Sequence, residues 1–414
     1  MDEKIIARDI EESNKWWKGD FHIPEYKYRK IYREIKKFIR TKQIIAITGL
    51  RRVGKTTMIL KLINERLNEG FPKMNIFYFS FDEYANVRIY DIIDIYEKIN
   101  GKSIKTENYF FAFDEIQKVK NWEEQLKKIY DVHPNIKFVI SGSESLFIRR
   151  KSRESLAGRI YEFLVNPLSF KEYLEFKDLK FDNLLLYRKN VLDEFGKFLL
   201  SNGFPEIINA DIDIAKKYVV EGVINKILYH DMGEIFGIKD TSIVRAIFNV
   251  IYNNPGQIIE IQELAGEIGI TRQLLSEYLE YLEESYLIKK LYNYSKNARK
   301  TQRRLKRYYS TIVNPLLIKD SFSKVFEQAL VLGCNSEYFW RDSYKNEVDI
   351  ILLDPLTAIE IKSGGIKERD LKSLQSFIKK FKPKEAKVIS YDIENEINGI
   401  KIIPFYKYLL AELK

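Results

Sequence analysis

The sequence predicts an α/β protein whose first part is built on a parallel β-sheet with helices on both faces. Short segments that are mostly apolar recur along it, and helical segments separate them; the apolar segments are residues 44–48, 75–81, 109–113 and 137–141. Strands without a polar face are buried on both sides, and intervening helices supply the crossovers that parallel strands need. The length of 414 residues suggests two to four domains at ~100–200 residues each.

Composition excludes several classes of protein. The sequence is 45% hydrophobic and 31% charged, which rules out a disordered, collagenous or disulfide-scaffold chain. Its formal charge of +10 suits an anionic partner but does not by itself indicate nucleic acid. Cys334 is the single cysteine, and the three histidines lie far apart, so neither a disulfide nor a metal-ligand pattern is present.

Targeting signals are also missing from the sequence. No apolar run approaches the ~20 residues that span a bilayer, and the first residues are charged and lack an apolar signal core. We therefore expect a cytoplasmic protein without a membrane partner. The N-terminal arm carries Trp16 and Trp17, which are candidates for packing on a neighbour.

The helices are predicted from spacing and punctuation. Residues 26–40 place Ile31, Ile35 and Ile39 at helical intervals, and a helix is expected from Thr56 to about Asn68. Residues 167–235 are mostly helical in character, with a Gly-Phe-Pro interruption at 203–205. This pattern predicts a helical segment after the parallel sheet.

The strongest motif lies between the first predicted strand and the helix that follows it. Residues 49–57 fit G-x-x-x-x-G-K-[ST]. The glycines let the backbone turn its N–H groups toward phosphate oxygens, and the helix N-terminus adds positive potential. Lys55 would contact the β- and γ-phosphates, and Thr56 would offer a hydroxyl to Mg²⁺. We therefore expect ATP and Mg²⁺ as cofactors, with the nucleotide held by Gly49, Arg52, Val53, Gly54, Lys55, Thr56 and Thr57.

A pair of carboxylates ends the apolar strand at 109–113. Asp114 would hold Mg²⁺ through water, which leaves Glu115 to orient and polarise the attacking water. The strand at 137–141 ends in Ser141, and a hydroxyl beside the phosphate site would sense the γ-phosphate. Capping of the following turn by Ser141 or Ser143 is an equally good interpretation.

Several further motifs follow in order, and together with the phosphate loop they resemble a known family. They are Phe-Asp-Glu-Ile-Gln-Lys-Val at 113–119, Ile-Ser-Gly-Ser at 140–143, Ser-Leu-Ala-Gly-Arg at 155–159, Asn-Pro-Leu-Ser-Phe-Lys-Glu-Tyr-Leu at 166–174 and Gly-Phe-Pro-Glu at 203–206. The set resembles a prokaryotic family of AAA-type P-loop ATPases with a C-terminal nuclease-like domain. The resemblance implies a RecA-like AAA+ core and Arg159 as an arginine finger supplied by a neighbouring subunit, hence a homo-oligomer. A structural ion pair is the alternative role for Arg159.

The segment after the helical region has the pattern of a winged helix. A helix at 242–252 precedes one at 261–268, a turn at Gly269, a helix at 271–284 and an alternating strand. The second helix of such a unit often enters the major groove, but here it carries four glutamates against one arginine. A packing role is therefore the alternative. The segment 296–307 is the better candidate for DNA phosphate contact, and a solvated loop is its alternative; its basic residues are Lys296, Arg299, Lys300, Arg303, Arg304, Lys306 and Arg307.

The last predicted domain carries a second group of acidic residues. Asp349 lies on one predicted strand, and Glu360 and Lys362 lie on the next, while Glu327 lies on a helix. Two carboxylates would bind Mg²⁺ or Mn²⁺, and the lysine would orient water. This looks like the PD-(D/E)XK nuclease signature. Both an active nuclease and a binding scaffold fit the motif.

The sequence therefore predicts a RecA-like AAA+ ATPase core with a helical lid, a winged-helix domain and a C-terminal restriction-endonuclease-like α/β domain. The expected boundaries are 1–30 for the arm, 31–165 for the core, 166–238 for the lid, 239–304 for the winged helix and 305–414 for the nuclease-like domain. The function expected is hydrolysis of Mg²⁺-ATP coupled to conformational change on DNA. The alternative is a nucleotide-controlled switch that recruits a protein partner without touching DNA.

Overall fold

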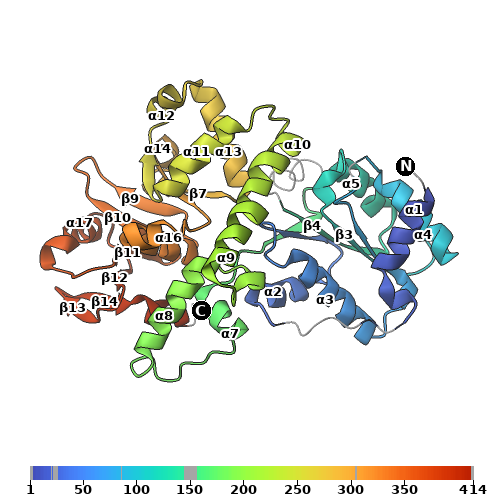
Figure 1. Ribbon diagram of the computed structural model, residues 1–414, viewed down its shortest axis with the longest axis horizontal. Coiled ribbons are helices and arrows are strands. Elements are labelled where there is room, and N and C mark those ends of the chain that lie inside the picture. The colour runs from blue at the N-terminus through green and yellow to red at the C-terminus, as the bar shows by residue number, and fades with distance from the viewer. Residues whose placement is uncertain are drawn as a thin grey trace. The chain divides into compact units, whose positions relative to one another are not determined.

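The computed structural model describes residues 3–19, 21, 27–84, 86–143, 156–303 and 305–411, and the chain forms two compact units (Figure 1). The first unit is Met1–Pro167 and the second is Leu168–Lys414. The predicted core and arm fall in the first unit, and the other three predicted domains fall together in the second. The finer boundaries stay a prediction. No helix in the described ranges is long and apolar enough to cross a membrane.

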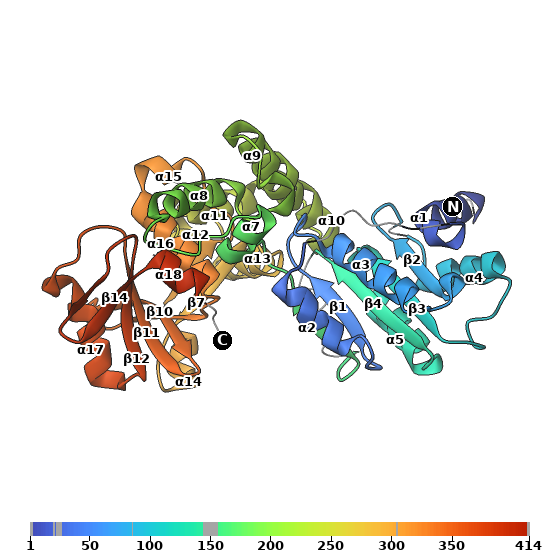
Figure 2. The ribbon, with the colours of Figure 1, turned by 90° about the horizontal axis from the view of Figure 1, so that it is seen from below.

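A five-stranded parallel sheet forms the centre of the first unit, as the apolar segments predicted. Every strand pairing in this sheet is parallel, and the strand order is β2-β3-β4-β1-β5. The strands are β1 (Ile44–Thr48), β2 (Ile76–Ser80), β3 (Tyr109–Asp114), β4 (Ile136–Gly142) and β5 (Ile160–Leu164). Figure 2 shows β1, β4 and β3 side by side. Because the strands are parallel, the residues that follow β1, β3 and β4 meet at one edge of the sheet.

Helices cover both faces of this sheet. They are α1 (Glu3–Ser13), α2 (Lys30–Phe38), α3 (Lys55–Asn68), α4 (Ile89–Asn100) and α5 (Trp122–Val132). The chain moves one way along the sheet from β1 to β2 and the other way from β2 to β4, so right-handed crossovers place α3 on one face and α4 and α5 on the other. An ion pair of 2.8 Å between Lys36 and Glu65 ties α2 to α3.

The N-terminal arm covers the edge strand β2 of its own unit. Asn14 donates from Nδ2 to the carbonyl oxygen of Tyr78 and accepts from its N–H, both at 2.8 Å. The indole nitrogens of Trp16 and Trp17 donate to the carbonyl oxygen of Ile76 at 3.1 and 2.9 Å. The tryptophans therefore pack within the chain, and their side chains satisfy backbone groups that an edge strand leaves open.

The second unit contains a nine-stranded sheet of order β13-β14-β12-β11-β10-β9-β7-β8-β6. Its pairings are antiparallel except for β11–β12, β12–β14 and β7–β9. The strands are β6 (Gln257–Ile259), β7 (Ile288–Asn293), β8 (Lys306–Ser310), β9 (Tyr338–Arg341), β10 (Glu347–Leu353), β11 (Leu356–Lys362), β12 (Glu385–Ser390), β13 (Asn395–Ile397) and β14 (Ile400–Pro404).

Two separate hydrophobic cores lie on the faces of β10 and β11. Ile350 and Ile359 pack with Phe326 in one core, and Ile351 and Ala358 pack with Phe377 in the other. The helices of this unit are α7 (Phe170–Phe176), α8 (Arg188–Ser201), α9 (Ile212–Val219), α10 (Met232–Phe236), α11 (Ser242–Asn253), α12 (Ile261–Ile268), α13 (Arg272–Glu284), α14 (Ala298–Arg303), α15 (Leu317–Asp320), α16 (Phe322–Gly333), α17 (Lys372–Phe381) and α18 (Phe405–Leu410). Because neighbouring residues of a strand point to opposite faces, α16 and α17 cover opposite sides of the sheet.

Replacing Asn14 by alanine tests the edge contact. The substitution leaves the N–H and the carbonyl of Tyr78 without their side-chain partner, and loss of such buried bonds costs ~1–3 kcal/mol of unfolding free energy. We expect the urea midpoint of the first unit, followed by tryptophan fluorescence, to fall. The exposed neighbour Lys15→Ala is the matched control and should leave the midpoint unchanged. An unchanged midpoint in N14A would contradict the role of this contact.

Candidate functional site

The loop that joins β1 to α3 has the backbone geometry of an anion cradle. Gly49 has a φ of +140°, and a Cβ at this position would lie 2.2 Å from the carbonyl oxygen of Val165. Gly54 precedes the first residue of α3 and has a φ of +97°. Both positions therefore require glycine, the first for close packing and the second for a left-handed turn. The turn leads directly into the N-terminus of α3, where anions are stabilised.

Lys55 is buried and lies over this loop. Its Nζ donates to the carbonyl oxygens of Gly49 and Leu50, both at 2.9 Å. An ammonium held by carbonyls of the loop is close to the place where phosphate oxygens would bind. The donor set therefore fits a polyphosphate.

Thr56 and Asp114, the two predicted magnesium ligands, are brought together. The hydroxyl of Thr56 donates to Oδ2 of Asp114 at 2.6 Å. The hydroxyl of Tyr78 donates to the same oxygen at 3.0 Å, and the hydroxyl of Ser141 donates to Oδ1. A hydroxyl and a carboxylate side by side offer the hard oxygen ligands that Mg²⁺ prefers. Burial, together with the charge of Asp114, raises the pKa of Tyr78 well above its usual value, so Tyr78 stays a donor.

Glu115 follows β3 in a left-handed conformation, with a φ of 52°. Its Oε2 accepts hydrogen bonds from Nε2 of Gln117 and, at 3.2 Å, from the hydroxyl of Ser143. Burial alone would raise the pKa of this carboxyl group, but the charge of Lys55 and the Gln117 hydrogen bond outweigh it, and the pKa lies below its usual value. Glu115 is therefore a carboxylate at neutral pH, as a base for water requires.

Ser141 joins the two acidic residues. Besides donating to Asp114, it accepts from the N–H of Glu115 at 3.3 Å. Gln117 donates to Ser143 as well as to Glu115, at 3.1 Å for Ser143. The hydroxyls at the end of β4 thus orient both carboxylates. A sensor role for Ser141 stays a prediction.

Three residues around the loop were missed by sequence reasoning. Arg29 donates to the carbonyl oxygens of Val53 at 3.1 Å and Asn166 at 2.8 Å, which ties the loop to the segment after β5. Tyr78 comes from a strand without a motif, and Gln117 stands inside the Phe-Asp-Glu-Ile-Gln-Lys-Val segment. Of the three, only Gln117 could have been suspected from the sequence, because it lies two residues after Glu115 in the same motif.

Arg159 lies away from the phosphate loop of its own chain. Its carbonyl oxygen accepts from the N–H of Ile44, so it lies at the start of β1 and β5, the sheet edge opposite the loop. Its side chain donates to Asp131 at 2.8 and 3.2 Å, on the surface. This contact agrees with the alternative role of Arg159, a structural ion pair. A finger role in a neighbouring subunit stays a prediction.

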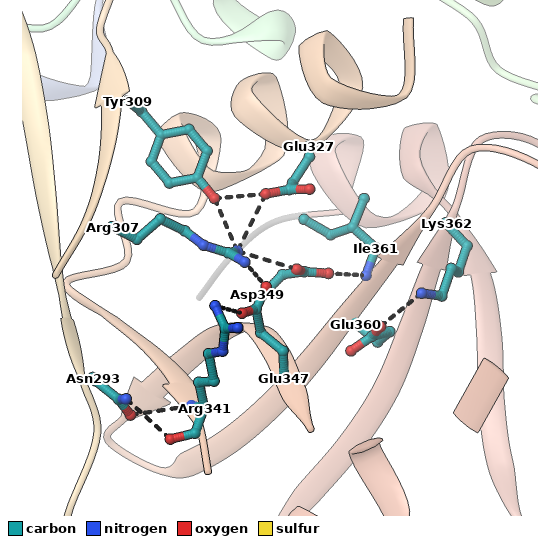
Figure 3. A network of polar contacts seen from close by, with 10 residues as sticks. All are labelled: Asn293, Arg307, Tyr309, Glu327, Arg341, Glu347, Asp349, Glu360, Ile361 and Lys362. Atoms are coloured by element: carbon teal, nitrogen blue, oxygen red, sulfur yellow. Dashed lines mark hydrogen bonds and ion pairs between the residues drawn. The ribbon is translucent and has the colours of Figure 1, made fainter. Parts of the chain in front are cut away.

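The second unit holds a carboxylate cluster, which we define as Glu327 on α16 with Glu347 and Asp349 on β10. Figure 3 shows the guanidinium of Arg307, from β8, directed between these side chains. Its Nη1 contacts Glu327 at 3.2 Å and Asp349 at 3.3 Å, and its Nη2 contacts Glu347. The hydroxyl of Tyr309 donates to Glu327 at 2.7 Å. The sequence predicted Glu327 and Asp349 here, but not Glu347, Arg307 or Tyr309.

Glu360 and Lys362 do not join this cluster through a hydrogen bond. Lys362 donates to Oε1 of Glu360 at 2.7 Å, while Asp349 accepts from the N–H of Ile361 at 2.8 Å. Glu360 lies within electrostatic reach of Asp349 and Glu327, whose charges raise its pKa, but its hydrogen bond is with Lys362. In the described ranges no three acidic, histidine or cysteine side chains lie close enough to hold one metal ion. The predicted convergence of Glu327, Asp349 and Glu360 on a metal is therefore not observed.

Burial has the largest effect on the pKa values of Glu327 and Glu360. Burial and the charge of Asp349 raise the pKa of Glu360 to about 8, against the opposing charge of Lys362. Burial and Asp349 likewise raise the pKa of Glu327 to about 7, although Arg307 opposes the shift. Both groups therefore take up protons near neutral pH.

The basic segment 296–307 is divided by the structure. Lys296, Arg299 and Lys300 are exposed at or beside α14, but Arg307 is only 5% exposed and is engaged in the cluster. Its predicted part in phosphate contact is therefore wrong. Arg304 of this segment, like Ser155 of the Ser-Leu-Ala-Gly-Arg motif, lies outside the described residues.

Comparison with known protein families matches three separate parts of the chain. Residues 41–174 match the model of an AAA domain, and residues 192–311 and 324–408 match two domains of unknown function, DUF8612 and DUF4143. Two uncharacterized proteins of Methanocaldococcus jannaschii are similar over most of their length. MJ1544 is 28% identical over 93% of this chain and 92% of its own, and MJ1637 is 24% identical over 93% and 89%.

Solved structures give a weaker likeness. CDC6P from Pyrobaculum aerophilum aligns with 12% identity over 78% of this chain and 98% of its own, with a TM-score of 0.32. That score carries no conclusion about this chain. The family model, the parallel sheet and the loop geometry agree on the first unit. Residues 41–174 are therefore similar to an AAA domain, and their sheet and loop have the geometry of a P-loop fold.

Proposed function

We propose that the protein is an ATPase that binds Mg²⁺-ATP at the loop 49–57. One observation carries this proposal: the hydroxyl of Thr56 lies 2.6 Å from Asp114, at the edge of the sheet where Lys55 and the ionised Glu115 also lie. Phosphate ligand, metal ligand and base are the three parts that phosphoryl transfer to water needs. The AAA-domain match over the same residues supports the proposal.

Each residue of the loop and of the neighbouring strand ends has a separate role in this proposal. Gly49 and Gly54 shape a backbone that receives the phosphates, and Lys55 leaves the carbonyls of Gly49 and Leu50 to pair with the β- and γ-phosphates. Thr56 and Asp114 would hold Mg²⁺, which supplies charge neutralisation of the phosphates when bound. Gln117 and Ser143 hold the Glu115 carboxylate, which accepts a proton from the attacking water.

The proposal also includes coupling of ATP hydrolysis to a conformational change on DNA. The order of α11, β6, α12, α13, β7 and β8, with β6 and β7 both paired to β8, supports a winged-helix arrangement. The exposed Lys296, Arg299 and Lys300 remain the candidate phosphate contacts. Action of Arg159 on a neighbouring copy would require a homo-oligomer in which Arg159 leaves Asp131.

A second candidate function is a nucleotide-controlled switch that recruits a protein partner. The burial of Arg307 and the acidic surface of α13 favour it, because both reduce the basic surface that DNA needs. In this case the same hydrolysis cycle would change the affinity for a protein.

Replacing Lys55 by alanine tests the proposal directly. The substitution removes the charge on the β- and γ-phosphates, and we expect ATP turnover to fall about 100-fold or more. Phosphate release with saturating Mg²⁺ measures the effect. The partly buried Lys61 on α3, whose ammonium lies over the ring of Tyr28, is the matched control, and Lys61→Ala should keep full turnover. Turnover within threefold of wild type in K55A would overturn the proposed site.

Glu115→Gln separates base chemistry from binding. The amide keeps the shape but accepts no proton, so we expect a loss of ~10²–10⁴-fold in kcat with nucleotide affinity preserved. Because the pKa of Glu115 is lowered, wild-type turnover should hold through mildly acidic pH and decline only below the usual range of glutamate. A pH profile with its acidic midpoint above that range would count against Glu115 as the base.

Titration with duplex DNA separates the two candidate functions. If the exposed cations bind phosphates, DNA should stimulate ATP turnover, and its affinity should fall steeply with added salt. The triple variant in which Lys296, Arg299 and Lys300 become alanine should lower both the affinity and the salt slope. Turnover that ignores DNA in wild-type protein would favour the switch.

A further inference from the structure

The carboxylate cluster of the second unit combines residue types that usually attract a divalent cation. Glu327, Glu347 and Asp349 are brought together from α16 and β10, and two of these positions matched a nuclease signature. Buried carboxylates need either a metal ion or a protein cation to balance their charge. The contacts of the cluster show which of the two this chain uses.

Arg307 supplies that cation from within the fold. Its side chain is 6% exposed, and its guanidinium contacts all three members of the cluster. Asp349 is fully engaged, because Oδ1 contacts Arg307 and Oδ2 accepts from the N–H of Ile361 at 2.8 Å. Glu327 uses Oε1 for both Arg307 and Tyr309. Both carboxylate oxygens of Asp349 and Oε1 of Glu327 therefore already face N–H and O–H donors.

The cluster is tightly packed on the side that faces β6. Gly256, in the turn before β6, packs so tightly on it that a Cβ there would lie 2.9 Å from Oε1 of Glu327 and 3.0 Å from a ring carbon of Tyr309. Magnesium keeps several waters when it binds to one or two carboxylates. On the side of this turn the packing leaves no room for even one added carbon atom, and therefore none for a hydrated ion.

Arg341 provides the contrast. Of the three cluster members its guanidinium contacts Glu347, at 3.6 Å, and its side chain is 32% exposed. It lies at the rim of the cluster, whereas Arg307 lies at the centre. The two arginines therefore form a matched pair, of which one neutralises the cluster and the other does not.

We propose that the guanidinium of Arg307 takes the place of a divalent cation among Glu327, Glu347 and Asp349. The cluster is then an internal ion-pair centre that joins β8, β10 and α16, and it binds neither Mg²⁺ nor Mn²⁺. The second unit acts as a scaffold, not as a metal-dependent hydrolase. Removal of the guanidinium leaves carboxylates and space in which a divalent cation binds. This inference does not depend on the ATPase proposal.

Mn²⁺ binding to the full chain without nucleotide tests the inference, with electron paramagnetic resonance counting the bound ion. We expect Arg307→Ala to bind one Mn²⁺ per chain more than the wild type. Arg341→Ala should bind the same amount as the wild type. In R307A, Mn²⁺ should also raise the thermal unfolding temperature, and the further change Asp349→Asn should abolish both the added ion and the shift.

Two results would overturn the inference. The first is a wild-type protein that loses a bound Mn²⁺ on Asp349→Asn, since the cluster would then hold metal beside Arg307. The second is a folded R307A that gains no Mn²⁺. If R307A folds only with Mn²⁺, the result supports the proposal. If it does not fold at all, the comparison of wild type with D349N decides.

Discussion

The carboxylate of Asp114 is the contact on which the first unit's site depends. It accepts from hydroxyls that come from α3, β2 and β4, and the backbone of β3 carries it to the edge of the sheet. A buried carboxylate needs such donors, because burial of an unpaired charge is costly. The donors in turn fix the ends of the elements that carry the phosphate loop. A site of this kind needs no separate scaffold, since the groups that stabilise its charge also set its geometry.

The link through Tyr78 extends this dependence to the N-terminal arm. The backbone of Tyr78 pairs with Asn14, and its hydroxyl pairs with Asp114. The arm therefore covers the sheet edge at the same residue that touches the site. Covering an edge strand prevents pairing with another chain. Here the cover also holds a tyrosine against Asp114, so one short segment serves both stability and site geometry.

Much of the first unit was predictable because its signals are local. The apolar segments at 44–48 and 109–113 became β1 and β3 almost residue for residue, and the glycines at 49 and 54 have the backbone angles their motif requires. Tyr78 could not be predicted as a neighbour of Asp114, since nothing in its own segment marks the side chain. Trp16 and Trp17 were expected to suit a neighbour, but strand order decides which edge is open, and that order is a property of the whole sheet.

The two groups of acids show why a short motif is weaker evidence than its residues suggest. Asp114 and Glu115 lie beside a glycine loop whose conformation is set within a few residues, so the motif and the geometry agree. Asp349 and Glu360 lie on strands whose facing residues come from far along the chain. There the deciding side chain is Arg307, which lies outside the motif and was assigned to a basic surface. Its neighbours reach it only through the pairing of β7 with both β8 and β9. A nuclease-like spacing therefore specifies carboxylates, but the fold determines which cation neutralises them.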